Sequence, residues 1–73
     1  MLSAEQVRGG RAMLRMTVAQ LASKAGVAPN TVVRLENGDG VNMRTMKAIQ
    51  SSLEAAGVEF TNGDAPGVRI RKR

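Results

Sequence analysis

The sequence of 73 residues contains no cysteine and no histidine. Disulfide bonds and thiolate sites are therefore excluded, and the usual zinc ligands are missing. A Ser-His-Asp triad cannot form, and the six acidic residues show no spacing suited to a metal site or an acid–base pair. We therefore expect no enzymatic activity, no metal and no cofactor.

Aromatic residues and long hydrophobic runs are also scarce. Phe60 is the single aromatic residue. No apolar run approaches the ~18 residues of a membrane span, and no signal-peptide segment is present. We expect a cytoplasmic protein that has no membrane contact and no evident small-molecule ligand. A chain this short buries only about 60% of its unfolded surface, so it forms one domain that needs good helix capping or a partner chain.

Positive charge is concentrated near one end of the chain. The net charge is +5, from eleven basic and six acidic residues. Four basic residues and no acid lie in the tail, at Arg69, Arg71, Lys72 and Arg73. A basic excess favours polyanions such as nucleic acid or anionic lipid. The alternative is a tail that only improves solubility.

Signals for four helices follow one another along the chain. S-x-x-Q and T-x-x-Q capping boxes at 3–6 and 17–20 begin the first two helices. Pro29 fits the first position of the third helix, and Asn42 is a suitable cap for the fourth. The two glycines Gly9 and Gly10 are expected to interrupt the first helix. Either another backbone approaches closely there, or that helix is simply weak. Glycines are expected to end the last three helices, at Gly26, Gly38 and Gly57.

Beyond residue 57 the hydrophobic period changes to two, which predicts a β-hairpin with its turn in 62–67. One register places four apolar side chains on one face and an ion pair on the other. That register pairs Val58 with Ile70, Glu59 with Arg69, and Phe60 with Val68. A lone hairpin is marginally stable, so this one is expected to pack on the helices or to pair with another chain.

The segment 17–36 has the physical pattern of a helix-turn-helix. Two short helices are joined by a tight turn at Gly26, and the small Ala22 allows them to cross closely. Apolar residues hold the second helix against the first, so that its opposite face projects outward: Leu21, Ala25, Val27, Val32 and Leu35.

The stretch LASKAGVAPNTVVRLENG, at 21–38, resembles the lambda-repressor/Cro-type (XRE-like) helix-turn-helix family. The resemblance covers residues 3 to about 57 and rests on A-x-L-A at 19–22, G-V at 26–27, T-V at 31–32 and L-E-N-G at 35–38. It implies a mainly α fold. A four-helix DNA-binding domain spans 1–57, with the helix-turn-helix at 17–36. A short β-hairpin and a basic tail at 58–73 follow as a possible dimerisation element.

The resemblance implies that the third helix reads bases in the major groove. Asn30 and Arg34 lie one turn apart, and their side chains suit adenine and guanine. Pro29, Val33 and Ala28 complete the expected base-contacting set. The alternative is that Asn30 and Arg34 are ordinary solvated surface residues.

Phosphate contacts are expected around the starts of the second and fourth helices. The sequence departs from the family at Val18, where many members have Gln, and at Ala28, where many have a capping Ser or Thr. Both departures weaken anchoring, for which the basic tail can compensate. The expected phosphate-contacting residues are Thr17, Val18, Thr31, Arg44 and Lys47.

Arg11 and Glu36 match family positions that form an internal ion pair between the first helix and the end of the recognition helix. An unpaired charge on the apolar face of the first helix would be costly. The alternative is that both side chains are exposed to solvent.

These features predict a sequence-specific binder of double-stranded DNA, a transcriptional regulator acting on an operator, with repression preferred over activation. A homodimer on an inverted repeat is expected, with its contacts at Val58, Phe60, Val68 and Ile70. One alternative is an antitoxin-like or other protein-interaction module on the same scaffold. Another is a nonspecific nucleic-acid or membrane binder driven by the tail.

Overall fold

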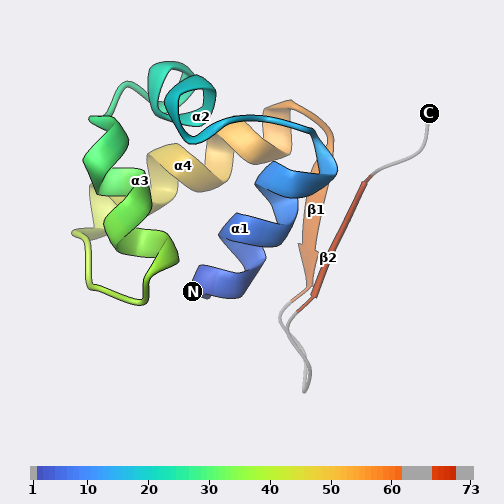
Figure 1. Ribbon diagram of the computed structural model, residues 1–73. Helices are drawn as coiled ribbons and strands as arrows, with labels where there is room; N and C mark the ends of the chain where they lie inside the picture. The colour runs from blue at the N-terminus through green and yellow to red at the C-terminus, as the bar shows by residue number, and fades with distance from the viewer. Residues whose placement is uncertain (1, 62–66, 71–73) are drawn as a thin grey trace.

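The computed structural model describes residues 2–61 and 67–70. Within them lie four helices followed by two strands, and both the fold class and the order of elements agree with the prediction (Figure 1). The turn residues 62–66 and the tail residues Arg71, Lys72 and Arg73 lie outside the described residues. The elements are α1 (Ala4–Met13), α2 (Val18–Ala25), α3 (Pro29–Glu36), α4 (Met43–Ala55), β1 (Val58–Thr61) and β2 (Gly67–Ile70).

Local capping signals set where three of the helices begin. Both predicted capping boxes form at the starts of α1 and α2. Asn42 Oδ1 accepts a hydrogen bond from the backbone of Thr45 at 2.8 Å and caps α4. By contrast, α3 starts at Pro29 after Ala28, which supplies no side-chain cap. This eight-residue helix is too short to be stable alone, so its neighbours must hold it in place.

The core takes side chains from all four helices and from the hairpin. Its fully buried members include Val7, Leu21, Val32, Ile49 and Val58. Helix α2 packs on both α3 and α4, α1 also contacts α3, and the hairpin lies beside α1 (Figure 1). The strands therefore share one core with the helices, although the sequence places them outside the helix-turn-helix segment.

The hairpin has the predicted register, with Val58 opposite Ile70 and Phe60 opposite Val68. Its docking surface on α1 contains the glycine pair. A Cβ on Gly9 would lie 3.1 Å from Val68 Cγ1, and one on Gly10 would lie 3.4 Å from Val58 Cγ1. Helix α1 thus runs without a break through the pair, contrary to the expected interruption, and the glycines admit strand side chains rather than another backbone.

This packing changes the role expected for the apolar face of the hairpin. Val58 is fully buried, and Phe60 and Val68 are half-buried against the core of their own chain. Among the large hydrophobic residues of the described strands, only Ile70 is exposed, with 39% of its surface accessible. The four expected dimer contacts thus do not form a single open face, because α1 covers most of it.

Gln6 fastens the hairpin to α1 in a way that the sequence analysis did not anticipate. Its Oε1 accepts from Ser3 N at 2.9 Å and completes the capping box. Its Nε2 donates to the carbonyl oxygens of Thr61 and Gly67, both at 3.0 Å. The side chain is almost completely buried. One amide therefore caps a helix and joins the facing ends of both strands.

Replacing Gln6 with Glu tests the Gln6 clasp, by which we mean the hydrogen bonds from Gln6 Nε2 to the two strands. The capping acceptor is kept, but a carboxylate oxygen then faces two carbonyl oxygens without a donor. We expect Gln6→Glu to lower the free energy of unfolding by about 1–3 kcal/mol at pH 7. Burial raises the pKa of this new carboxyl in the folded state. The loss should therefore shrink as the pH falls toward the ordinary pKa of Glu, about 4.3.

Gln20 is the matched control for the clasp, because it occupies the same capping-box position in α2 but is exposed. Gln20→Glu should leave stability unchanged or slightly raised, since an acid in the first helical turn is favourable. Urea denaturation at pH 7 and pH 4.5 measures both variants. Equal stability of Gln6→Glu and the wild type at pH 7 would contradict the clasp.

Candidate nucleic-acid interface

The outward face of α3 carries the residues expected to read bases. Val32, Leu35 and Glu36 are buried, whereas Asn30 and Arg34 are exposed one turn apart. Pro29, Val33 and the preceding Ala28 are exposed as well. In Figure 1, α3 lies at the edge of the molecule away from the hairpin. The structure thus brings the expected base-contacting residues together on one open helix face.

A polar hollow of about 260 Å³ lies beside this face, between α3 and the start of α4. Its lining includes Arg34 and also Thr31, which was expected to contact phosphate. Sequence reasoning missed the contribution of Asn42 and Thr45, because nothing in the sequence showed that the start of α4 lies against α3. The lining residues are Thr31, Arg34, Gly40, Val41, Asn42 and Thr45.

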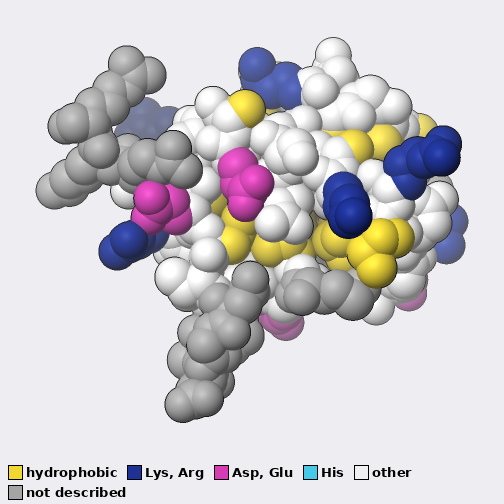
Figure 2. Space-filling model, turned by 180° about the vertical axis from the view of Figure 1, so that it is seen from behind, with side chains coloured by type: hydrophobic (Ala, Val, Ile, Leu, Met, Phe, Trp, Pro, Cys, Tyr) yellow, Lys and Arg dark blue, Asp and Glu magenta, His cyan; other side chains and the backbone are white. Residues whose placement is uncertain are grey.

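The start of α4 is electropositive. Arg44 and Lys47 are exposed there, and the first turn of α4 contains no acidic residue. The N-terminal end of a helix dipole adds a partial positive charge at the same place. Seen from behind, Lys and Arg side chains lie on several parts of the surface, including the side that holds α3 and the start of α4 (Figure 2). This region suits the phosphates that flank a groove.

The start of α2 offers few side-chain donors, as Val18 already indicated in the sequence. Thr17 is exposed, and its hydroxyl oxygen accepts from Gln20 N at 3.0 Å, which leaves its O–H available to donate. The side chain of Val18 packs against the core. A phosphate at this position can therefore be bound by the Val18 backbone N–H, as is usual in a first helical turn, but not by its side chain.

Arg11 and Glu36 form a bidentate ion pair behind the recognition helix. Arg11 Nε lies 2.8 Å from Glu36 Oε2, and Nη2 lies 2.9 Å from Oε1. Arg11 Nη1 also donates to the carbonyl oxygen of Met16 at 3.1 Å. The hydrogen bonds to Glu36 raise the pKa of Arg11 above its ordinary value, so the guanidinium stays charged. The pair ties α1 and the α1–α2 turn to the last residue of α3.

A model of the Helix-turn-helix family matches residues 8–56. The chain belongs to the lambda-repressor/Cro-type helix-turn-helix family. DNA-binding transcription regulation is therefore its general function, and the family is typically non-enzymatic. A comparison with curated proteins found no match. None of the helices in residues 2–61 and 67–70 is long and apolar enough to cross a membrane.

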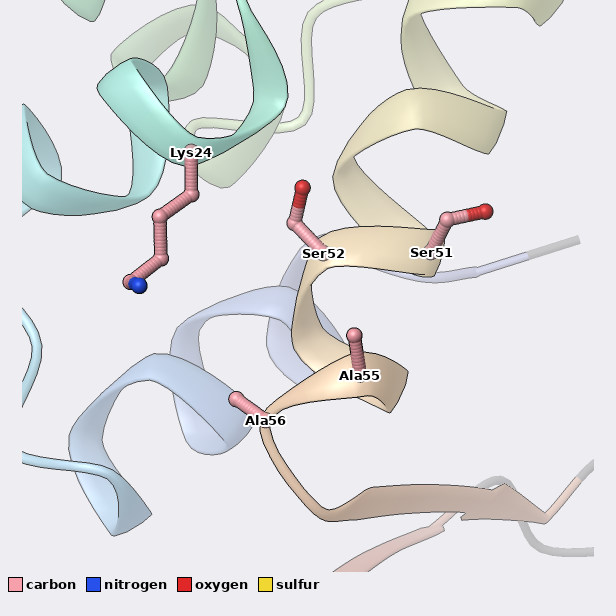
Figure 3. A pocket seen from close by; sticks show the side chains of 5 residues that line it. All are labelled: Lys24, Ser51, Ser52, Ala55 and Ala56. Atoms are coloured by element: carbon pink, nitrogen blue, oxygen red, sulfur yellow. The ribbon is translucent and has the colours of Figure 1, made fainter.

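A second hollow of this helix-turn-helix protein lies away from the interface. It has a volume of about 340 Å³ and lies between the ends of α2 and α4, where Lys24 extends beside Ser52 and Ala56 (Figure 3). The start of α4, with Arg44 and Lys47, is at the opposite end of a helix of 13 residues. None of the residues expected to contact DNA lines this hollow.

The internal ion pair gives a direct prediction about stability. Arg11→Met leaves the largely buried Glu36 carboxylate without its partner and should lower the free energy of unfolding by about 3 kcal/mol. The double variant Arg11→Met with Glu36→Leu removes both charges and should recover much of that loss. Denaturation midpoints of the single and double variants measure the effect.

The ion pair on the hairpin is the control for this experiment. Arg69 Nε lies 2.7 Å from Glu59 Oε1, but the Arg69 side chain is 71% exposed. Arg69→Met should therefore change stability by less than about 1 kcal/mol. If Arg11→Met were as mild as Arg69→Met, the proposed support of α3 would be wrong.

Proposed function

We propose that this protein binds a specific duplex DNA sequence by inserting α3 into the major groove and that it represses transcription by occupying an operator. One observation carries the proposal: α3 is held by its buried side while Asn30 and Arg34 project together from the other. Operator occupancy blocks polymerase without any additional contact. We therefore propose repression, because it needs DNA binding alone and no contact with polymerase.

The chemistry of the exposed face fits base edges. Asn can form two hydrogen bonds to adenine N6 and N7, and Arg can form two to guanine O6 and N7. The major groove is about 12 Å wide and admits one α-helix. Asn30 and Arg34 would read two neighbouring steps of the groove, and the exposed Val33 and Ala28 would contact thymine methyl groups.

Phosphate anchoring on both sides of α3 would fix the register. The Thr17 hydroxyl and the Val18 N–H would bind the backbone on one side of the groove. Thr31, which lines the polar hollow, and the exposed Arg44 and Lys47 on α4 would bind it on the other side. Such contacts position the protein but carry no sequence information.

Selection of duplexes from a random pool tests the proposed function. We expect repeated rounds at ~0.15 M salt to enrich one short motif containing at least one G·C and one A·T pair at fixed positions. Random duplexes of the same length provide the reference affinity. Recovery of sequences no better than this reference would contradict specific recognition.

Two arginine variants separate base reading from anchoring. Arg34→Ala should weaken binding to the selected site by about 1–3 kcal/mol and relax the preference at one base pair. Arg44→Ala should weaken binding to all duplexes and make the dependence of log K on log salt shallower by about one unit. Fluorescence anisotropy titrations at several salt concentrations measure both. If Arg34→Ala lowered the affinity for all sequences equally, the proposed base contact of Arg34 would be wrong.

We also propose that the protein acts as a homodimer on an inverted repeat, with β2 at the interface. Within the described residues, β2 pairs with β1 alone, so its other edge has no strand partner. Ile70 lies on β2 and remains exposed. Pairing of two β2 edges around a two-fold axis would cover both. The residues packed on α1 would keep their positions.

Ile70→Asp should convert the dimer to a monomer while leaving the helical content unchanged. Met13→Asp is the matched control, because Met13 is a similarly exposed hydrophobic residue on α1. Sedimentation equilibrium at micromolar concentration measures the mass of each. A dimeric Ile70→Asp would exclude this interface, and a monomeric wild type would exclude the dimer itself.

A further inference from the structure

Arg15 adopts a backbone conformation that L-amino acids rarely take. Its φ is +54°, and it is the one non-glycine residue with positive φ in the described part of the chain. The residue lies just beyond α1. Arg15 N donates to Ala12 O and Met16 N donates to Arg11 O, both at 3.0 Å. These two bonds form a Schellman motif, in which the left-handed position is usually glycine.

The same chain uses glycine for this purpose elsewhere. Gly26 follows α2 and Gly57 lies just beyond α4, with φ of +71° and +107°. Glycine adopts such angles without a Cβ clash, whereas arginine at this position is strained. Strain of this kind persists only when something else requires the residue, and it is concentrated at functional sites.

The hydrogen bonds of the Schellman motif hold this conformation, but they involve the backbone alone and would form equally well with glycine. Arg15 is exposed, and its guanidinium makes no hydrogen bond or ion pair with another described residue. Arginine also adds a permanent positive charge at this point, because the guanidinium group is not deprotonated in proteins. The described residues therefore give no reason for an arginine side chain at this position.

The residue that follows Arg15 is linked through Arg11 to the end of α3. The carbonyl oxygen of its neighbour Met16 is held at 3.1 Å by Arg11. The same guanidinium binds Glu36 at the end of α3. Two residues after Arg15, Thr17 caps α2. Consecutive Cα atoms are about 3.8 Å apart, so Arg15 lies within about 8 Å of that helix start.

We propose that Arg15 is a DNA phosphate contact and that its strained conformation is retained for this contact. The proposal rests on the proposed function and assigns a residue that lies outside the matched phosphate positions. It also accounts for the start of α2, where the packed Val18 side chain supplies no donor. Arg15, two residues before the cap of α2, would provide a charged donor near the same helix start.

Arg15→Gly separates the two consequences of this arrangement. Relief of the left-handed strain should raise the thermal unfolding midpoint by a few degrees. Loss of the charge should weaken binding to every duplex about fivefold at 0.15 M salt, and should make the slope of log K against log salt shallower by about 0.9 per bound protomer. Stability and affinity should thus change in opposite directions.

Two further variants serve as controls. Arg15→Lys keeps the charge and the left-handed backbone, so its midpoint, affinity and salt slope should stay close to those of the wild type. Lys24→Ala removes one positive charge beside the second hollow, at the far end of α4. Its salt slope should not change, which separates a local phosphate contact from the effect of net charge.

The experiment distinguishes failure of this inference from failure of the proposed function. A random-sequence duplex and the selected site are titrated with each variant. A wild-type slope for Arg15→Gly, together with a shallower slope for Arg44→Ala, would overturn the role of Arg15 and leave DNA binding intact. A wild type that binds neither duplex would overturn both. A lower unfolding midpoint for Arg15→Gly would overturn the claim of strain.

Discussion

A single guanidinium group supports the placement of the recognition helix. Arg11 binds both carboxylate oxygens of Glu36 and the carbonyl oxygen of Met16. Removing two charges from water is costly, and the cost is offset only where the geometry is bidentate and the remaining donors are used. Because α3 has eight residues and no side-chain cap, it cannot maintain its own shape or direction. The ion pair, together with the buried Val32 and Leu35, provides that support.

Helix α1 is therefore the organising element, although it contributes none of the family-matched DNA contacts. One of its sides holds α3 through Arg11, and another holds the hairpin through Gln6 and the glycine pair. The hairpin in turn adds the fully buried Val58 to a core that a chain of this length can barely complete. The glycine pair lowers the intrinsic stability of α1. Burial of the strand side chains that pack on the pair offsets this loss.

Local signals explain which features the sequence predicted. The capping boxes, Pro29, the end of α2 at Gly26 and the hairpin register all depend on residues close in sequence or on a simple period. The second role of Gln6 and the hollow lined by Asn42 and Thr45 depend on how distant elements meet, which no local pattern contains. The apolar period of the strands showed a face that must be covered. It did not show that α1 would cover it, since that outcome depends on how side chains fit over Gly9 and Gly10.

The division between supporting and contacting residues has a consequence for specificity. The residues that hold α3 point inward, and those expected to read bases point outward, so Asn30 or Arg34 can be exchanged without a change in the core. Under the proposed function, sequence preference could then change while stability is preserved, because surface substitutions usually change stability by less than about 0.5 kcal/mol. Arg15 does not follow this division. Its side chain is exposed, but its backbone is strained, so selection for tighter binding and selection for a more stable fold would favour different residues at this one position.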